Sequence, residues 1–303
     1  MATHSPSPSP APFSRREFLT AGAAWCGACA SLGAAESSTP NPPPEPIIDI
    51  HQHTHYHGRS DEQMLAHQRA MGVTTSILLP AGRPTVRPAT HGGRSNGLAA
   101  NCTGNEAVVE FAKVHPGEFL FGANEVTDLP EAKGEIEKYL KLGAKIIAEQ
   151  KFGVQCDSEH SQTLYALAAD YGVPIRLHLQ EGTYNSGFKR LPDMLKKFPK
   201  TIFIMHAQTT WASIDANYDG KNLYPTGLVA KGGLTSQYLG DYPNCFADMS
   251  AGSGLNSLLR DEEHPRWFLD MHQDHMRDVR DCADTIGRGP GCQGAGTIAA
   301  IRK

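Results

Sequence analysis

The sequence has little of several features that define other classes of protein. It contains no block of basic residues, and its formal net charge is −4 over 303 residues, so neither nucleic acid nor a membrane surface is expected as a partner. No apolar run is long enough to stay in a membrane permanently. Hydrophobic residues make up 40% of the chain and charged residues 20%, which is typical of a globular protein with an ample core.

Paired cysteines are also scarce. Of the seven cysteines, Cys26 and Cys29 precede the expected globular region, and the others show neither zinc-finger spacing nor a disulfide framework. Cys282 and Cys292 are the pair close enough in sequence to suggest a bridge. Isolated buried thiols are the preferred interpretation.

The first 46 residues predict export and not a folded element. Arg15 and Arg16 lie in a twin-arginine pattern over residues 14–20, followed by a weakly apolar stretch rich in Ala and Gly. We therefore expect a twin-arginine signal peptide over residues 1–35, recognised by the twin-arginine export machinery, and a periplasmic location. The alternative is a Ser/Pro-rich tail that happens to hold two arginines. Residues 36–46 predict a stiff, Pro-rich linker, and residues 47–303 a single domain.

From residue 47 onward, strand-like and helix-like segments alternate. Apolar runs predict strands at 47–53, 73–79, 119–123, 144–151, 173–179, 201–206 and 245–249. Helices are expected at 60–71, 105–115, 131–142, 158–171 and 191–198, with a long irregular insert at 208–242. This order predicts an α/β fold with a parallel sheet, and the domain has the size of a (β/α)8 TIM barrel. An open doubly wound sheet is the alternative, but no glycine-rich phosphate turn follows the first strand.

Two histidines end the first predicted strand. His51 and His53 point to the same face because side chains alternate along a strand. Two imidazoles placed in this way can bind one divalent ion. The alternative is a His-rich loop start, since His55 and His57 continue the alternation.

Three further predicted strands end in ligand-type side chains. Glu149 and Lys151 share a face at the end of the fourth, His178 ends the fifth and His206 ends the sixth. The carboxyl ends of barrel strands meet at one rim, so these side chains are expected to lie near the two strand-one histidines. Each one alone could be a hydrogen-bonded core residue. Together they predict a divalent metal site, for zinc first and for manganese or iron as alternatives.

The motifs resemble those of the second amidohydrolase family, a branch of the amidohydrolase superfamily of TIM-barrel metal-dependent hydrolases. The resemblance covers nearly all of residues 47–303. It rests on the segments 49–53 (Asp-Ile-His-Gln-His), 149–152 (Glu-Gln-Lys-Phe), 206–208 (His-Ala-Gln) and 250–256 (Ser-Ala-Gly-Ser-Gly-Leu-Asn). It implies a TIM barrel whose metal ligands are His51, His53, Glu149, His178 and Asp281.

The resemblance also implies catalytic roles. His206 would polarise the substrate carbonyl, and Asp281 would take the proton from the attacking water. Lys151, if carbamylated, is the alternative to Glu149 as a metal ligand; otherwise we expect it to bind the substrate.

The eighth strand departs from the family pattern. Family members carry an apolar strand that ends in Gly-Ser-Asp, whereas residues 275–281 are charged on both faces. Asp278 and Asp284 are therefore alternatives to Asp281. We expect the eighth strand and helix to be irregular or truncated.

The function expected from these motifs is hydrolysis of a small amide, ester or lactone. A divalent ion with an open position lowers the pKa of bound water from about 16 toward about 7. Arg59, just past the first strand, and Trp211, in the insert, are further candidates for substrate binding. The alternatives are a solvated surface arginine and a tryptophan that only packs the insert.

Two other functions stay open. The same family contains nonoxidative decarboxylases, and an arginine clamp such as Arg59 would favour that reaction. A catalytically inactive barrel that binds a metal or ligand is the third possibility, favoured by the altered eighth strand. Barrels of this family often pair, so a homodimer is compatible with the resemblance.

Overall fold

The computed structural model describes residues 45–86, 101–277 and 281–303. The expected signal peptide lies outside these residues, as do Asp278 and all but the last two residues of the expected linker. The predictions made for those segments therefore stay predictions.

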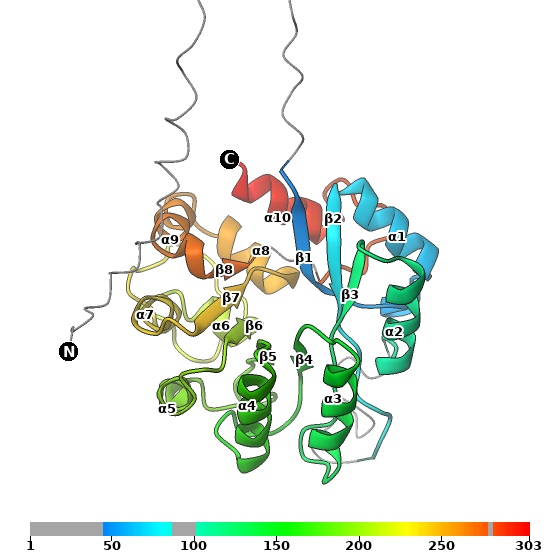
Figure 1. The fold of residues 1–303 in the computed structure, drawn as a ribbon. Coiled ribbons are helices and arrows are strands. Elements are labelled where there is room, and N and C mark those ends of the chain that lie inside the picture. The colour runs from blue at the N-terminus through cyan, green and yellow to red at the C-terminus, as the bar shows by residue number, and fades with distance from the viewer. Residues whose placement is uncertain (1–44, 87–100, 278–280) are drawn as a thin grey trace, which may run out of the picture. The chain divides into compact units, whose positions relative to one another are not determined.

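Eight parallel strands in the described residues form the wall of the barrel (Figure 1). One sheet has three strands and the other has five, and every ladder is parallel. A parallel bridge between Ala123 and Ile147 continues the wall from the first sheet to the second. The predicted parallel α/β architecture is confirmed. The strands are β1 (Ile47–Gln52), β2 (Val73–Leu78), β3 (Phe119–Phe121), β4 (Ile147–Gln150), β5 (Ile175–His178), β6 (Phe203–His206), β7 (Cys245–Asp248) and β8 (Met276–Arg277).

Helices surround the strands on the outside (Figure 1). The five predicted helices are present, with ends that differ from the predictions by a residue or so. The insert at 208–242 is less irregular than predicted, because it contains two helices, α6 and α7. The helices are α1 (Asp61–Ala70), α2 (Asn105–Val114), α3 (Ala132–Lys141), α4 (Glu159–Tyr171), α5 (Leu191–Lys197), α6 (Gln208–Ala212), α7 (Leu234–Asp241), α8 (Ala251–Leu259), α9 (His264–His272) and α10 (Gln293–Ile301).

Local sequence signals set the ends of the early helices. Ser60 and Gln63 form a reciprocal capping box at the start of α1, which satisfies two of the free backbone N–H groups there. Ser158 caps α4, and Gly172 ends it in the left-handed conformation that glycine adopts without strain. These caps fix where each helix begins relative to the preceding strand end.

Alternation along β5 and β6 divides the core into two layers. Ile175, Leu177, Phe203 and Met205 point outward into the main apolar cluster under the helices. Ile204 points inward, into a smaller apolar cluster contributed by several strands. That cluster forms a floor inside the ring, and the inward-pointing residues beyond it reach the rim.

The last strand of the barrel, β8, and the chain around it are irregular. β8 has two residues, as expected for a divergent eighth strand, and it pairs with β7 at one side. On the other side, the backbone N–H of Asp281 donates to the carbonyl of His51 over 2.8 Å. The final helix differs from the expectation of a truncated element, since α10 is nine residues long and packs against α8.

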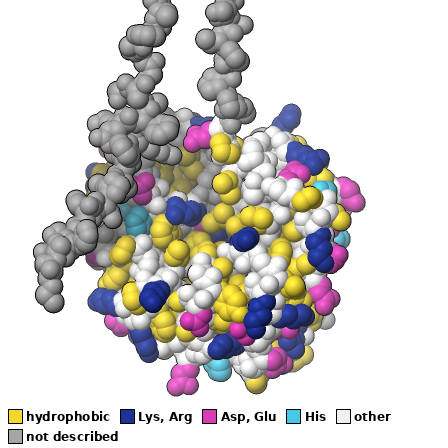
Figure 2. Space-filling model, in the orientation of Figure 1, with side chains coloured by type: hydrophobic (Ala, Val, Ile, Leu, Met, Phe, Trp, Pro, Cys, Tyr) yellow, Lys and Arg dark blue, Asp and Glu magenta, His cyan; other side chains and the backbone are white. Residues whose placement is uncertain are grey.

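The surface carries both signs of charge. Figure 2 shows Lys and Arg side chains interspersed with Asp and Glu side chains across one face, in agreement with the small net charge of −4. Among the described residues, no helix is long and apolar enough to cross a membrane.

Candidate metal centre

Histidine and carboxylate side chains from separate strands converge at the carboxyl-terminal rim of the barrel. The described residues that combine into potential metal-binding groups of three there are His51, His53, Glu149, His178, His206 and Asp281. Within each group the ligand atoms lie within 4.8 Å of one another, and all of these residues are buried. The structure thus brings together every predicted metal ligand, and His206 with them.

His51 on β1 and His53 just after it present one nitrogen each to this centre. The register between β1 and β2 shifts between Asp49 and Gln52, so Ile50 joins the floor while His51 and His53 meet above it. His53 Nδ1 lies 2.7 Å from the carbonyl oxygen of Leu79 and must donate to it. The lone pair of His53 is therefore on Nε2, which faces the centre.

Glu149 lies in the middle of the group. The register between β4 and β5 shifts between Ile147 and Gln150, and such a shift re-aims a side chain. Oε2 of Glu149 lies 3.4 Å from His51 Nε2 and 3.5 Å from His53 Nε2. Its Oε1 lies 2.6 Å from His178 Nδ1. Glu149 thereby connects strands that are far apart in sequence.

Asp281 completes the ring from the opposite side. It has a positive φ of 42°, an uncommon conformation for an aspartate that directs its carboxylate inward. Oδ1 lies 3.4 Å from His53 Nε2, and Oδ2 lies 3.8 Å from His206 Nε2. The structure places Asp281 in the centre. Of its predicted alternatives, Asp284 lines the cavity but lies in none of the centre's ligand groups, and its Oδ2 is 3.8 Å from His67 Nε2 on α1; Asp278 lies outside the described residues.

Asp248, at the end of β7, orients two of the histidines. It was not identified as a site residue from the sequence. Its carboxylate accepts from His51 Nδ1 at 3.1 Å and from His206 Nδ1 at 2.8 Å. Because both Nδ1 atoms carry protons, both Nε2 atoms have lone pairs that point into the centre. Arg176 forms an ion pair with Asp248 from below, with 2.7 Å between Nε and Oδ2. His178 and His206 were predicted because they end parallel strands, and Asp248 could have been predicted in the same way.

The electrostatics of the centre favour ionised carboxylates. Burial would raise the pKa of Glu149, but Lys151 and the hydrogen bond from His178 hold it well below its usual range. Burial is likewise outweighed at Asp281, where His51 and His53 lower the pKa to about 2. The pKa of His178 falls to about 4, because of burial first and Lys151 second, so this imidazole is neutral at pH 7. The centre therefore combines negative carboxylates with the neutral imidazole of His178.

This donor set fits a divalent cation. His53 Nε2 and Asp281 Oδ1 are both buried and have no hydrogen-bond partner among the described residues. Buried polar atoms are normally paired, and a bound ion would satisfy both at once. Imidazole nitrogen combined with carboxylate oxygen suits zinc, manganese and iron.

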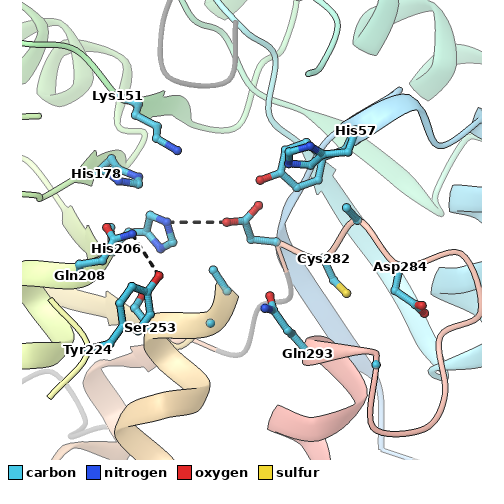
Figure 3. Close-up of a pocket in the computed structure, with 17 residues that line it drawn as sticks. His57, Lys151, His178, His206, Gln208, Tyr224, Ser253, Cys282, Asp284 and Gln293 are labelled. Carbon is cyan, nitrogen blue, oxygen red and sulfur yellow. Dashed lines mark hydrogen bonds and ion pairs between the residues drawn. The ribbon is translucent and has the colours of Figure 1, made fainter. Parts of the chain in front are cut away.

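A cavity of about 450 Å³ opens onto the centre (Figure 3). This volume is in the range of small-molecule sites. Lys151, His178 and His206 line one side and Gln293 lies across from them, and Asp281 also lines the cavity. The predicted substrate-binding residue Lys151 thus lies at the cavity, and in Figure 3 its amino group points into the open space.

Arg59 and Trp211 do not face this cavity, which corrects their assignment to substrate binding. Trp211 is buried, and its indole N–H donates to the backbone oxygen of Asp248 over 2.9 Å. The guanidinium of Arg59 donates to the carbonyls of Cys282 and Asp284 at 2.7 and 3.0 Å. Both side chains support the backbone of the centre and are out of reach of a substrate.

Replacing Arg59 by methionine is expected to lower the free energy of unfolding by about 2–4 kcal/mol, because buried carbonyl groups would lose a charged donor. Chemical denaturation measures this change. Arg69→Met is the matched control, since the ion pair of Arg69 with Glu118 is exposed and should contribute under about 1 kcal/mol. Equal effects of the two substitutions would contradict the buried role of Arg59.

Comparison with known proteins supports the fold. No protein-family model matches the sequence, and no curated protein matches it. Among solved structures, an uncharacterized TIM-barrel protein from Bordetella bronchiseptica is similar with a TM-score of 0.52 and 14% identity, over 80% of this chain and 75% of that one.

Two solved enzymes are similar at a comparable level. A 2,6-dihydroxybenzoate decarboxylase, solved with 2,6-dihydroxybenzoate, has a TM-score of 0.50 and 13% identity over 86% of this chain and 93% of its own. The 5-carboxyvanillate decarboxylase of Sphingomonas paucimobilis has a TM-score of 0.50 and 14% identity, over 81% of this chain and 78% of its own. At these identities the likeness concerns the fold, and the predicted (β/α)8 barrel is confirmed.

Proposed function

We propose that this protein is a metal-dependent enzyme of the second amidohydrolase family, and that it removes a carboxylate from a small hydroxylated aromatic acid without oxidation. The observation that carries the proposal is the convergence of imidazole nitrogens and two carboxylates next to a cavity that a lysine lines. The two similar decarboxylases suggest the reaction class by analogy of fold. This proposal replaces hydrolysis as the preferred interpretation.

The metal would be held by His51, His53, Glu149 and Asp281, with His178 supporting Glu149. A divalent ion there would supply a Lewis acid that neutralises and orients anionic oxygens of the substrate. Zinc, manganese and iron all remain candidates, because the donor set suits each of them.

Lys151 would bind the acidic substrate. Its side chain follows directly from β4 and lines the cavity on the side of His178. An ammonium group in a partly enclosed cavity pairs strongly with a carboxylate. This is the role that the sequence had suggested for an arginine, and here a lysine is in position for it.

Asp281 and His206 would handle the proton. In a nonoxidative decarboxylation the carbon–carbon bond breaks, its electron pair stays on the ring carbon, that carbon takes up a proton, and carbon dioxide leaves. His206 Nε2 and Asp281 Oδ2 lie 3.8 Å apart at the cavity, so either group could take a proton from solvent and deliver it to the ring carbon.

Hydrolysis is the second candidate. The specific observation in its favour is the buried Oδ1 of Asp281, which has no hydrogen-bond partner in the described part of the chain and could accept a proton from an attacking water. The same residues then act on an ester, lactone or amide, and His206 stabilises the developing oxyanion.

The products separate these two reactions. Metal-loaded protein would be incubated with hydroxybenzoates, including 2,6-dihydroxybenzoate and 5-carboxyvanillate, and with a panel of lactones, esters and amides. The proposal predicts release of carbon dioxide, with one deuterium at the ring carbon when the solvent is heavy water. Hydrolysis without carbon dioxide would favour the second candidate. Bound metal with neither activity would favour an inactive barrel.

Lys151→Met is expected to raise KM about 10- to 100-fold for the carboxylate substrate, because a charge-assisted contact worth about 1.5–3 kcal/mol would be lost. Steady-state kinetics measures this change. Lys145→Met is the matched control, since Lys145 is exposed and lies just before β4, away from its carboxyl end. An unchanged KM in Lys151→Met would contradict the assigned contact.

We also propose export through the twin-arginine pathway, supported by the Arg15–Arg16 pattern. Cell fractionation of Arg15→Lys/Arg16→Lys protein tests this, and continued export of that variant would contradict it.

A further inference from the structure

Three buried ligand-type side chains lie together outside the candidate metal centre. They are His67 on α1, Cys282 in the segment after β8, and Cys292 at the start of α10. Their exposed fractions are 0%, 3% and 1%. The two sulfurs lie 3.8 Å apart, and Cys292 Sγ lies 3.4 Å from His67 Nε2. The proposed reaction uses none of these residues.

The separations match those of a tetrahedral zinc site. With bonds of about 2.3 Å to sulfur and about 2.0 Å to nitrogen, tetrahedral angles place two sulfurs about 3.8 Å apart and sulfur and nitrogen about 3.5 Å apart. Asp284 offers a fourth donor, since its Oδ2 lies 3.8 Å from His67 Nε2. In Figure 3, Cys282 and Asp284 come from one loop beside the cavity.

The surroundings of the sulfurs suit thiolates. Cys292 is the N-cap of α10, and its sulfur accepts from the backbone N–H of Ala295 at 3.4 Å. The positive end of a helix stabilises a thiolate, which is the form that binds a metal. The charges of two thiolates balance those of a divalent ion, and the further negative charge of Asp284 lies near the Arg59 guanidinium, which donates to the carbonyls of Cys282 and Asp284.

A disulfide explains the cluster less well. It requires the sulfurs to approach to about 2.05 Å, and both cysteines are free in this structure. His67 is fully buried, and its Nε2 lies 3.4 Å from Cys292 Sγ and 3.8 Å from Asp284 Oδ2. A disulfide would leave His67 Nε2 facing an almost apolar group, whereas a metal ion would bind this nitrogen.

We propose that His67, Cys282 and Cys292, with Asp284 as the fourth ligand, bind a second divalent ion of the zinc class with a structural role. The ion would hold Cys282, in the segment after β8, against His67 on α1. Such an ion would help to position Asp281, because β8 has only two residues and Asp281 is adjacent to Cys282 in the chain. The same segment already packs tightly on α1, since a Cβ at Gly287 would lie 2.5 Å from the carbonyl oxygen of His67.

Cobalt substitution of the full chain tests the proposal. Cobalt bound by thiolate gives a charge-transfer absorption band that imidazole and carboxylate ligands do not give, so the band reports on this site and not on the candidate metal centre. We expect the band to saturate at about one equivalent, and added zinc to abolish it.

Substitutions of individual residues test which side chains bind the cobalt that gives this band. The band should disappear in Cys282→Ser and in Cys292→Ser and persist in the control Cys102→Ser. It should also persist in His51→Ala/His53→Ala, which separates failure of this proposal from failure of the proposed function. Absence of the band from wild-type protein, or its loss only in Cys102→Ser, would overturn the proposal.

A measurement on the unmutated protein keeps the test valid if the serine variants do not fold. Zinc-loaded protein should protect Cys282 and Cys292 from alkylation, and a chelator should expose them. Intact-mass analysis of freshly isolated protein should give the mass of free thiols. A mass lower by two hydrogens, with the missing thiols mapped to this pair, would show a disulfide and overturn the proposal.

Discussion

Asp248→Asn is expected to weaken binding of the metal at the candidate centre about 10- to 100-fold and to lower the free energy of unfolding by about 3–5 kcal/mol. The first effect arises because an amide cannot hold both His51 and His206 with Nε2 as the lone-pair nitrogen. The second arises because Arg176, fully buried beneath the centre, would lose its counter-charge. Metal titration and chemical denaturation measure the two effects.

The control for Asp248→Asn is the same change of carboxylate to amide at an exposed ion pair. Glu110 pairs with Lys113 on the surface of α2, and Glu110→Gln should change stability by under about 0.5 kcal/mol. If Asp248→Asn bound metal as tightly as wild type, Asp248 would not orient the histidines.

Asp281→Asn is expected to lower kcat about 10²- to 10⁴-fold, because an amide can neither accept nor deliver the proton that the reaction requires. The amide has nearly the same shape, so the backbone bond from Asp281 to His51 should remain and the fold should be unchanged. Metal affinity should fall as well, since one charged donor is lost. Activity measured at saturating metal separates the two effects.

Asp193→Asn serves as the matched control for Asp281→Asn, because Asp193 is an exposed residue of the first turn of α5. Full activity of Asp281→Asn at saturating metal would contradict its role in proton transfer. In that case His206 alone would have to carry the proton.

Much of the fold and most of the centre could be predicted from strand periodicity. The residues that end β1, β4, β5 and β6 were predicted to lie together because parallel strands of a barrel end at one rim. The structure places His178 and His206 on neighbouring strands at paired positions, as that rule requires. The rule was not extended to β7, so Asp248 was missed although it ends a strand in the same way.

Other parts depend on geometry that periodicity does not contain. The shifts of register in β1 and β4 re-aim His51 and Glu149, and they follow from tertiary contacts. Arg59 follows the first strand closely in sequence, yet its long side chain folds back onto the segment after β8. Asp281 reaches the centre through a positive φ after a two-residue strand, which no pattern of apolar residues indicates.

The measurement that tests the central claim most directly is the metal content of purified wild-type protein beside that of His51→Ala/His53→Ala. The metal centre predicts that the histidine variant contains about one equivalent of divalent ion less than wild type, with the fold retained by circular dichroism. Equal metal content in the two proteins would contradict the assignment of these histidines as ligands, and the proposed function would fail with it.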